Sequence, residues 1–301
     1  MAARTISGCW PTAFALAALV ASQAAIAEVL EQVMRVAGAT VHYKVVLPAD
    51  YDPEKEYPAV LVFGGGPQTM DTVDRTLERN FRAEAERRGY IVVAPAAPDG
   101  EQFFREGDRI FPEFLEMILG EYRIEERKFH VAGPSNGGIS ALHVAAKHPQ
   151  YFRSVTAFPG YLWQPTDAKL IALSSLCVFL YIGERDEFPW HSEMQREAEF
   201  LRARGALARY TVEKGQPHRI ETLAGAGAAR LFEGFEEAER GCTVEPEGRA
   251  APARVEAGTL AGATPEPRDG GVPWGGSTGS IGDADSRSGL RMARAGGAAR
   301  S

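Results

Sequence analysis

The clearest pattern in the chain is a repeated change between short apolar runs and amphipathic segments. Residues 31–52 alternate apolar and polar positions on either side of Gly38, which predicts an antiparallel hairpin. The apolar run 59–63 then breaks at three consecutive glycines, as expected for a buried strand that ends in a glycine-rich loop. Residues 70–88 close at Gly89 and predict a helix, because their apolar positions have helical spacing: Val73, Leu77, Phe81 and Ala85.

The same alternation continues to about residue 240. Apolar runs predict further strands at 90–95, 128–133, 152–158, 177–183 and 208–213, and amphipathic segments predict helices at 110–122, 139–148, 191–205 and about 221–240. Strands that alternate with helices are typical of a mostly parallel sheet with helices on both faces. The pattern therefore predicts one α/β domain over residues 28–242.

Both ends of the chain differ from this pattern. Residues 1–27 combine Arg4, a short apolar stretch and small residues up to Ala27, which predicts a secretory signal peptide cleaved before Glu28. An uncleaved membrane anchor is the alternative, but the apolar run is short for a membrane span. Residues 243–301 are rich in Gly, Ala, Pro, Ser and Arg and lack apolar periodicity, so we expect a disordered tail.

Composition and charge limit the partners and the compartment. The hydrophobic content of 45% suffices for a substantial core, and the formal net charge of -7 with no basic stripe argues against nucleic-acid binding. We expect no stable membrane insertion and a secreted or periplasmic product. Cys177 and Cys242 remain after removal of the leader, and they either form a disulfide or stay a buried and a free thiol. The sequence does not indicate an oligomeric state.

A G-x-S-x-G motif at Gly133, Ser135 and Gly137 is the strongest chemical signal. The motif follows a predicted strand and precedes a predicted helix, which is the context of a nucleophile elbow. Small neighbours are needed there, because the chain turns sharply at the serine. A second match at 275–279 around Ser277 lacks both the strand and the helix. Ser135 is therefore the predicted nucleophile.

A serine hydroxyl needs a base, and the base needs a carboxylate to orient it. His218 follows the last predicted strand in a Gly- and Pro-containing loop and is the favoured base, with His191 as the alternative. Asp186 follows the strand at 177–183 and is the favoured acid, because hydrolases of this type place the acid between the serine and the histidine. Glu184 and Glu187 compete for that role.

Backbone N–H groups are the usual donors to a developing oxyanion. The predicted donors are Asn136, directly after the nucleophile, and Gly65 or Gly66 in the glycine-rich loop, which could also form no more than a tight turn. Aromatic side chains predict a substrate pocket, although aromatic residues in loops often pack in the core instead. The pocket candidates are Phe103, Phe104 and Trp163, together with Phe158 and Tyr161.

The ordered set of the glycine-rich loop, the GPSNG elbow, the GERD loop and the late His218 resembles the α/β-hydrolase superfamily over residues 33–240. Within it, the chain looks like the secreted esterases grouped with polyhydroxybutyrate depolymerases and feruloyl esterases. That resemblance implies a Ser135, Asp186 and His218 triad. The family often has a histidine before the oxyanion glycines, and this chain has Phe63 there.

The expected function is an exported serine esterase that acts on a small or oligomeric ester through an acyl-enzyme. We expect no cofactor and no metal, because the sequence contains neither an H-E-x-x-H motif nor paired Cys-x-x-Cys motifs. Two alternatives remain: a serine peptidase similar to the prolyl oligopeptidases, and a catalytically silent hydrolase-fold protein that binds a ligand.

Overall fold

The computed structural model describes residues 28–242, so the predicted leader at 1–27, the predicted tail at 243–301 and Ser277 lie outside the described residues. Eight strands form one sheet in the order β1-β2-β4-β3-β5-β6-β7-β8. Their bounds are β1 Glu28–Val36, β2 Ala39–Leu47, β3 Tyr57–Val62, β4 Ile91–Pro95, β5 Ile124–Gly133, β6 Phe152–Ala157, β7 Cys177–Gly183 and β8 Ala208–Glu213.

Strand β2 pairs antiparallel with both β1 and β4, and all other neighbouring strands pair in parallel. The hairpin and the mostly parallel sheet that the periodicity predicts are therefore confirmed. Because the parallel strands share one direction, their carboxyl ends lie along one edge of the sheet. The loops after β3, β5, β7 and β8 consequently meet at that edge.

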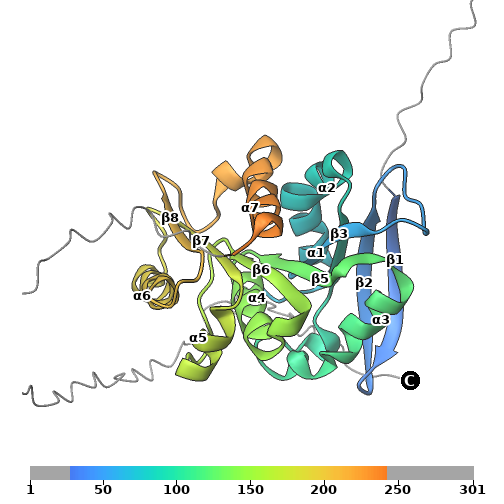
Figure 1. Ribbon diagram of the computed structural model, residues 1–301, viewed down its shortest axis with the longest axis horizontal. Helices are drawn as coiled ribbons and strands as arrows, with labels where there is room; N and C mark the ends of the chain where they lie inside the picture. Colours follow the sequence, from blue (N-terminus) through green and yellow to red (C-terminus); the bar gives the residue numbers. More distant parts are fainter. Residues whose placement is uncertain (1–27, 243–301) are drawn as a thin grey trace, which may run out of the picture. The chain divides into compact units, whose positions relative to one another are not determined.

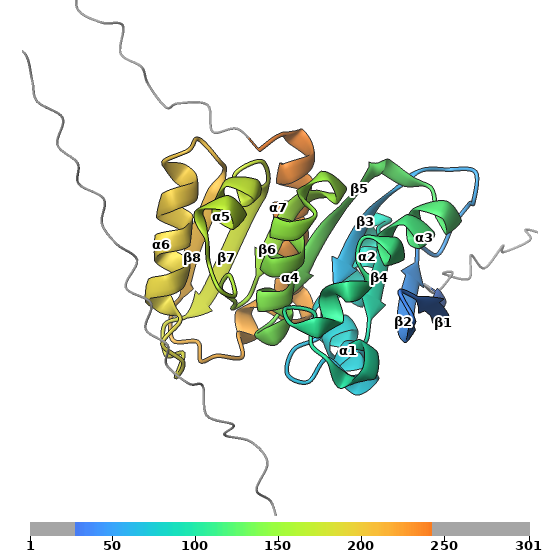
Figure 2. The same ribbon diagram turned by 90° about the horizontal axis from the view of Figure 1, so that it is seen from below.

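Helices cover both faces of the sheet (Figure 1). One face carries α1 Met70–Thr76, α2 Arg82–Arg88 and α7 Ala229–Arg240, and the other carries α3 Glu113–Glu121, α4 Asn136–Lys147, α5 Asp167–Leu173 and α6 His191–Arg202. Figure 2 shows the second group in front of the strands. Each layer encloses its own apolar cluster, and the largest fully buried side chains are phenylalanines such as Phe81 and Phe232 on one side and Phe114 and Phe129 on the other.

Two predicted helices differ from the structure. The helix predicted over residues 70–88 is interrupted by the π-helical turn Leu77–Phe81 between α1 and α2. The helix predicted over 221–240 begins only at Ala229, after two 3₁₀ turns, Glu221–Leu223 and Gly225–Ala228. A side chain at Gly227 would lie 2.3 Å from the carbonyl oxygen of Thr222, so this segment folds back on itself in a way that apolar spacing does not reveal.

Candidate functional site

Ser135 lies at a sharp turn between β5 and α4. Its backbone has φ 54° and ψ -124°, a conformation that costs a non-glycine residue about 1–3 kcal/mol. The glycines of the motif make this turn possible. A Cβ atom at Gly133 would lie 2.5 Å from the backbone of Gly137, and one at Gly137 would lie 2.3 Å from the carbonyl oxygen of Phe63. The motif therefore presents the serine at the carboxyl edge of the sheet, where the loops converge.

His218 and Asp186 complete a chain of hydrogen bonds with this serine. His218 Nε2 lies 2.9 Å from Ser135 Oγ, and His218 Nδ1 lies 3.0 and 2.9 Å from the two carboxylate oxygens of Asp186. The Asp186 side chain is fully buried, whereas 17% of the His218 side chain is exposed. This arrangement favours the tautomer in which Nδ1 carries the proton and Nε2 accepts one from the serine.

The loops that hold the acid and the histidine are braced against each other. The Glu184 carboxylate accepts the Gly215 N–H at 2.7 Å, and Arg185 Nε donates to the Gly215 carbonyl at 2.9 Å. A Cβ atom at Gly183 would lie 2.2 Å from the carbonyl oxygen of Pro217, so the two loops approach more closely than a side chain permits. Glu184, a competitor for the acid role in the sequence, therefore ties the loops together, and Glu187 is exposed.

His191, the alternative base, has both ring nitrogens engaged elsewhere. Its Nδ1 lies 3.0 Å from the Tyr210 hydroxyl and its Nε2 lies 3.0 Å from the Gly183 carbonyl oxygen. Its position at the start of α6 thus supports the β7 loop, and His218 is the histidine that the structure places next to Ser135.

The predicted oxyanion donors lie beside each other. Asn136 is the first residue of α4, so its N–H lacks a partner within the helix. Its side-chain amide donates to the Gly66 carbonyl at 2.9 Å, and Gln102 donates to the same oxygen at 3.0 Å. A Cβ atom at Gly65 would lie 3.2 Å from the Pro134 carbonyl oxygen. The glycine-rich loop is thereby fastened against the nucleophile elbow, with both sets of N–H groups close to Ser135.

Gln68 supports this loop and is not identified by any sequence motif. The side chain is fully buried. Its Nε2 donates to Ser140 Oγ at 2.8 Å, and its Oε1 accepts the Phe103 N–H at 3.0 Å. Gln68 has a φ of 56°, an uncommon value for a residue with a side chain. No sequence signal identifies Gln68, because the sequence does not show that this one glutamine is buried in the loop after β3.

A cavity of about 300 Å³ opens beside Ser135 and His218. Fifteen residues line it: Gly65, Gly66, Pro67, Thr72, Arg75, Thr76, Arg79, Asn80, Pro134, Ser135, Phe158, Pro159, His218, Arg219 and Ile220. This volume is at the lower end of the range of small-molecule sites. Its wall comes chiefly from the glycine-rich loop, from α1 with the π-helical turn, and from the loop that carries the histidine.

Of the five aromatic candidates for the substrate pocket, Phe158 lines this cavity. The other four lie outside its lining: Phe103, Phe104, Tyr161 and Trp163. Phe103 is fully buried and packs against Phe63 at 4.7 Å between ring centroids, in agreement with the alternative that it belongs to the core. Phe104 contacts Trp163 at 5.4 Å, with the Arg105 guanidinium over both rings. Phe63 occupies the position where the family that the sequence resembles often has a histidine. Its side chain is fully buried and packs in the core.

Two other aromatic side chains border His218. The Phe188 ring lies 4.6 Å and the Trp190 ring 5.0 Å from the His218 ring, both edge-on, and Trp190 also contacts Tyr161 at 5.3 Å. Phe188 is 44% exposed. These residues follow Asp186 in the loop after β7, and no sequence motif singles them out.

A buried carboxyl group supports the loop after β6. Glu197 on α6 accepts the Leu162 N–H at 2.8 Å, and burial raises the pKa of Glu197 to about 8. The group is therefore mainly protonated at neutral pH, which avoids a buried charge.

Cys177 and Cys242 form a disulfide that links the start of β7 to the segment after α7. This resolves the alternative that the sequence left open. Within residues 28–242, no cluster of three or more His, Cys, Asp or Glu side chains could hold a metal ion, and no helix is both long and apolar enough to cross a membrane.

Comparison with known proteins agrees with this architecture. A family model named Esterase, with the description "Putative esterase", matches residues 35–234. A curated relative, dipeptidyl-peptidase 5 of Porphyromonas gingivalis, is 33% identical over 128 residues, which cover 38% of this chain and 19% of that protein. The chain thus spans about a fifth of the length of the curated relatives it matches.

Solved structures show the same fold. A thermostable esterase superposes with a TM-score of 0.56 at 16% identity over 70% of this chain and 62% of its own. A ferulic acid esterase superposes with a TM-score of 0.51 at 21% identity over 71% of this chain and 98% of its own. The predicted α/β-hydrolase fold and the resemblance to esterases are confirmed. Because the family model covers more than half of the chain, the protein belongs to this esterase family.

Proposed function

We propose that the protein is an exported serine hydrolase that cleaves carboxylic esters. One observation carries the proposal: Ser135 Oγ lies 2.9 Å from His218 Nε2, and Asp186 holds the opposite ring nitrogen. A serine at a strained elbow, a histidine within hydrogen-bond reach and a buried carboxylate form the arrangement that activates a hydroxyl nucleophile. Membership of the esterase family supports the same chemistry.

The reaction would proceed in two halves. His218 takes the proton from Ser135 as Oγ attacks the ester carbonyl, and the Asp186 carboxylate stabilises the resulting imidazolium. The N–H groups of Asn136 and of Gly65 or Gly66 stabilise the negative charge on the carbonyl oxygen. His218 then returns the proton to the leaving alcohol. A water molecule, deprotonated by His218, attacks the acyl-enzyme and releases the acid.

Export is part of this proposal. The pattern of residues 1–27 is typical of a secretory leader, and a Cys177–Cys242 disulfide is compatible with an oxidising compartment. Expression of the full chain and determination of the amino terminus of the product test the point. We expect a mature protein that begins at Glu28, and retention of residues 1–27 on a cytoplasmic product would contradict it.

The esterase proposal is tested with the full chain and 4-nitrophenyl butyrate as a neutral, short ester. We expect measurable kcat/KM for the wild type and a loss of about 10⁴-fold or more in kcat for His218→Ala. His191→Ala is the matched control, because His191 is the histidine that the structure assigns to loop support. An equal loss of kcat in the control, or full activity in His218→Ala, would overturn the assignment.

A serine peptidase is the second candidate, favoured by the 33% identity to a dipeptidyl-peptidase over 128 residues. A dipeptidyl-peptidase must accept a substrate with a free amino terminus, whose positive charge calls for an acidic partner. The lining of the cavity beside Ser135 contains no acidic residue. Hydrolysis of a dipeptide 4-nitroanilide as fast as of 4-nitrophenyl butyrate would reverse the order of the two candidates.

A further inference from the structure

The cavity beside Ser135 is lined by positively charged side chains and by no negatively charged ones. Arg75, Arg79 and Arg219 all line it, and no aspartate or glutamate does. Most of the exposed surface of the wall is apolar and includes Phe158 and Ile220, so the three arginines place positive charge beside an apolar surface. Arginine presents a planar fork of N–H donors that matches carboxylate and phosphate groups in two-point contacts. The lining therefore differs from that expected for a purely apolar acyl group.

Internal ion pairs leave this positive charge incompletely neutralised. The Arg79 guanidinium lies 2.7 Å from Glu221, and Arg219 lies 3.4 Å from the same carboxylate, which is 59% exposed. Arg75 is exposed, and its guanidinium contacts no acidic side chain within residues 28–242. One carboxylate thus serves two arginines, and the third has no partner among the described residues. An incoming anion would find donors that are not already saturated.

Contacts fix Arg79 relative to His218. Arg79 lies in the π-helical turn Leu77–Phe81, a type of helical irregularity that often occurs at functional sites. It also donates to the Ile220 carbonyl at 3.3 Å, and the neighbouring Asn80 donates to the Leu223 carbonyl at 2.6 Å. These contacts attach the helix to the loop that carries His218. A charge bound at Arg79 would therefore be held at a defined position relative to the reacting ester.

We propose that the substrate of this esterase carries an anionic group, a carboxylate or a phosphate-type group, that binds at Arg75 and Arg79 while Ser135 attacks the ester. The inference rests on the proposed function and adds the substrate class to it. The anion belongs either to the acyl chain or to the alcohol. Both arrangements need the same recognition chemistry, which the arginines of the lining supply.

The test compares ester pairs that differ in charge and little in shape. Monomethyl adipate and methyl adipamate place a carboxylate or a neutral carboxamide on the acyl chain, and 4-carboxyphenyl butyrate and 4-carbamoylphenyl butyrate place them on the alcohol. Methyl 5-phosphonopentanoate and 4-phosphonophenyl butyrate distinguish a phosphate-type anion from a carboxylate. We expect at least one pair to show a tenfold or larger preference in kcat/KM for the anion, which weakens as the salt concentration rises.

Arg75→Gln is the informative variant, because no internal contact among the described residues depends on that guanidinium. We expect this variant to reduce the ratio of kcat/KM for the anionic ester to kcat/KM for its neutral counterpart about tenfold, because one charge-assisted contact is lost. Arg123→Gln is the matched control: Arg123 is also exposed, and it lies just before β5, at the opposite edge of the sheet. An unchanged ratio in Arg75→Gln, or no preference for any anion, overturns the inference while ester turnover itself supports the proposed function.

A binding measurement separates this inference from the esterase proposal. Calorimetric titration of Ser135→Ala with the same esters reports affinity without turnover. Tighter binding of the anionic member, lost in the Ser135→Ala, Arg75→Gln double variant, supports the anion site even if no ester is hydrolysed by the wild type. Equal affinities for charged and neutral esters would contradict it, whatever the outcome of the kinetic assay.

Discussion

Within residues 28–242, a serine, a histidine and an acidic residue lie together in two places that differ in their surroundings. Ser135, His218 and Asp186 lie in loops at the carboxyl edge of the sheet. The second set lies inside: His130 Nδ1 is 2.7 Å from Ser154 Oγ, and His130 Nε2 is 3.5 Å from Glu239. His130 belongs to β5 itself, five residues before the nucleophile, and Ser154 belongs to β6.

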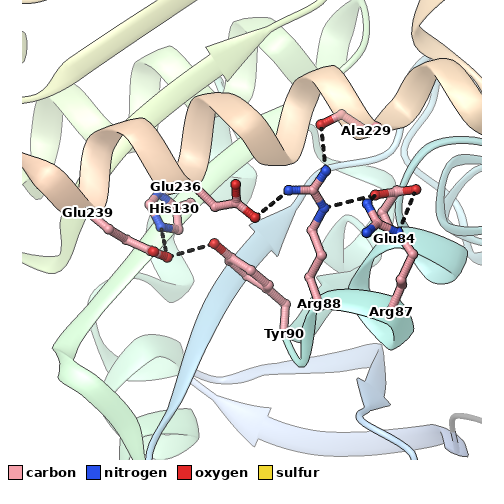
Figure 3. A network of polar contacts seen from close by, with 8 residues as sticks. All are labelled: Glu84, Arg87, Arg88, Tyr90, His130, Ala229, Glu236 and Glu239. Atoms are coloured by element: carbon pink, nitrogen blue, oxygen red, sulfur yellow. Dashed lines mark hydrogen bonds and ion pairs between the residues drawn. The ribbon is translucent and has the colours of Figure 1, made fainter.

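The inner set belongs to a structural network (Figure 3). Glu239 also accepts the Tyr90 hydroxyl at 2.6 Å, and Arg88 contacts Glu84 and Glu236, so α2 and α7 are joined across their face of the sheet. Burial lowers the pKa of His130, which is 1% exposed. For Glu239, burial acts to raise the pKa, but the contacts with His130 and Tyr90 outweigh it and the pKa is lowered.

The difference between the sets shows what residue types alone do not supply. Ser154 is fully buried and lies within a strand, whereas Ser135 lines a cavity at a turn with positive φ. Of the two serines, only Ser135 has a helix N-terminus and a glycine-rich loop beside it, and backbone N–H groups at such places are the usual oxyanion donors. We therefore expect access and preset donors to decide which set performs chemistry, and we expect the inner set to contribute to stability.

The largest expected contrast comes from exchanging the two serines for alanine. Ser135→Ala should lower kcat by about 10⁶-fold because the nucleophile is lost, with little change in the free energy of unfolding. Ser154→Ala should leave kcat nearly unchanged but lower the free energy of unfolding by about 1–3 kcal/mol, since His130 loses its buried partner. Steady-state kinetics and urea unfolding of both variants measure the contrast. A strong loss of kcat in the folded Ser154→Ala variant would contradict the predicted difference between the two serines.

The acidic residues provide the next contrast. Asp186→Asn should reduce kcat by about 10⁴-fold, because the amide favours the wrong tautomer of His218. Glu239→Gln keeps a side chain of the same shape at the inner set and should leave kcat within about twofold, as it has no contact with the reacting groups. Rates of 4-nitrophenyl butyrate hydrolysis check the pair, and equal rate losses would show that the two sets are functionally coupled.

Gln68→Ala should have a smaller effect on catalysis. Loss of the amide that connects the glycine-rich loop to Ser140 and Phe103 loosens the oxyanion donors, and a misplacement of this kind costs about 10- to 100-fold in kcat. KM should change less than kcat. Gln195→Ala, at an exposed glutamine on α6, is the control. Lower stability with unchanged kcat would show that Gln68 supports the fold and not the donors.

The smallest expected effect is a pH dependence of stability that comes from His130. The pKa of this histidine is lower in the folded than in the unfolded chain, so below the unfolded value of about 6.5 the unfolded state binds more protons. The free energy of unfolding should therefore fall as the pH drops from 6.5. His130→Phe should flatten this dependence by up to about 1.4 kcal/mol per pH unit. The exposed His42 provides the control His42→Phe, and an equal slope in both variants would contradict the prediction.

The sequence predicts the parts of the molecule that local chemistry determines. Apolar runs mark the strands because parallel strands are buried on both faces, and the close packing at Gly133 and Gly137 explains why the elbow has a recognisable motif. The seven-residue helix α5 was not predicted, because one or two turns give too little periodicity. The π-helical turn after α1 leaves no pattern that separates it from an α-helix.

Residues that act through tertiary contacts could not be read from the chain. Gln68, Arg75 and Phe188 come near the triad only because loops and helices far apart in sequence meet at one edge of the sheet. Conversely, Phe103 looked available for substrate and is instead packed in the core. The order of Ser135, Asp186 and His218 along the chain, together with the Gly- and Pro-containing loop around His218, predicts the triad.

The most direct test of the central claim is labelling of the folded protein with a fluorophosphonate probe, followed by peptide mapping. The account predicts modification at Ser135 alone, loss of labelling in His218→Ala, and no modification of the buried Ser154. Absence of labelling in the folded wild-type protein, or labelling that persists without His218, would contradict an activated serine and favour a hydrolase-fold protein that binds ligands without catalysis.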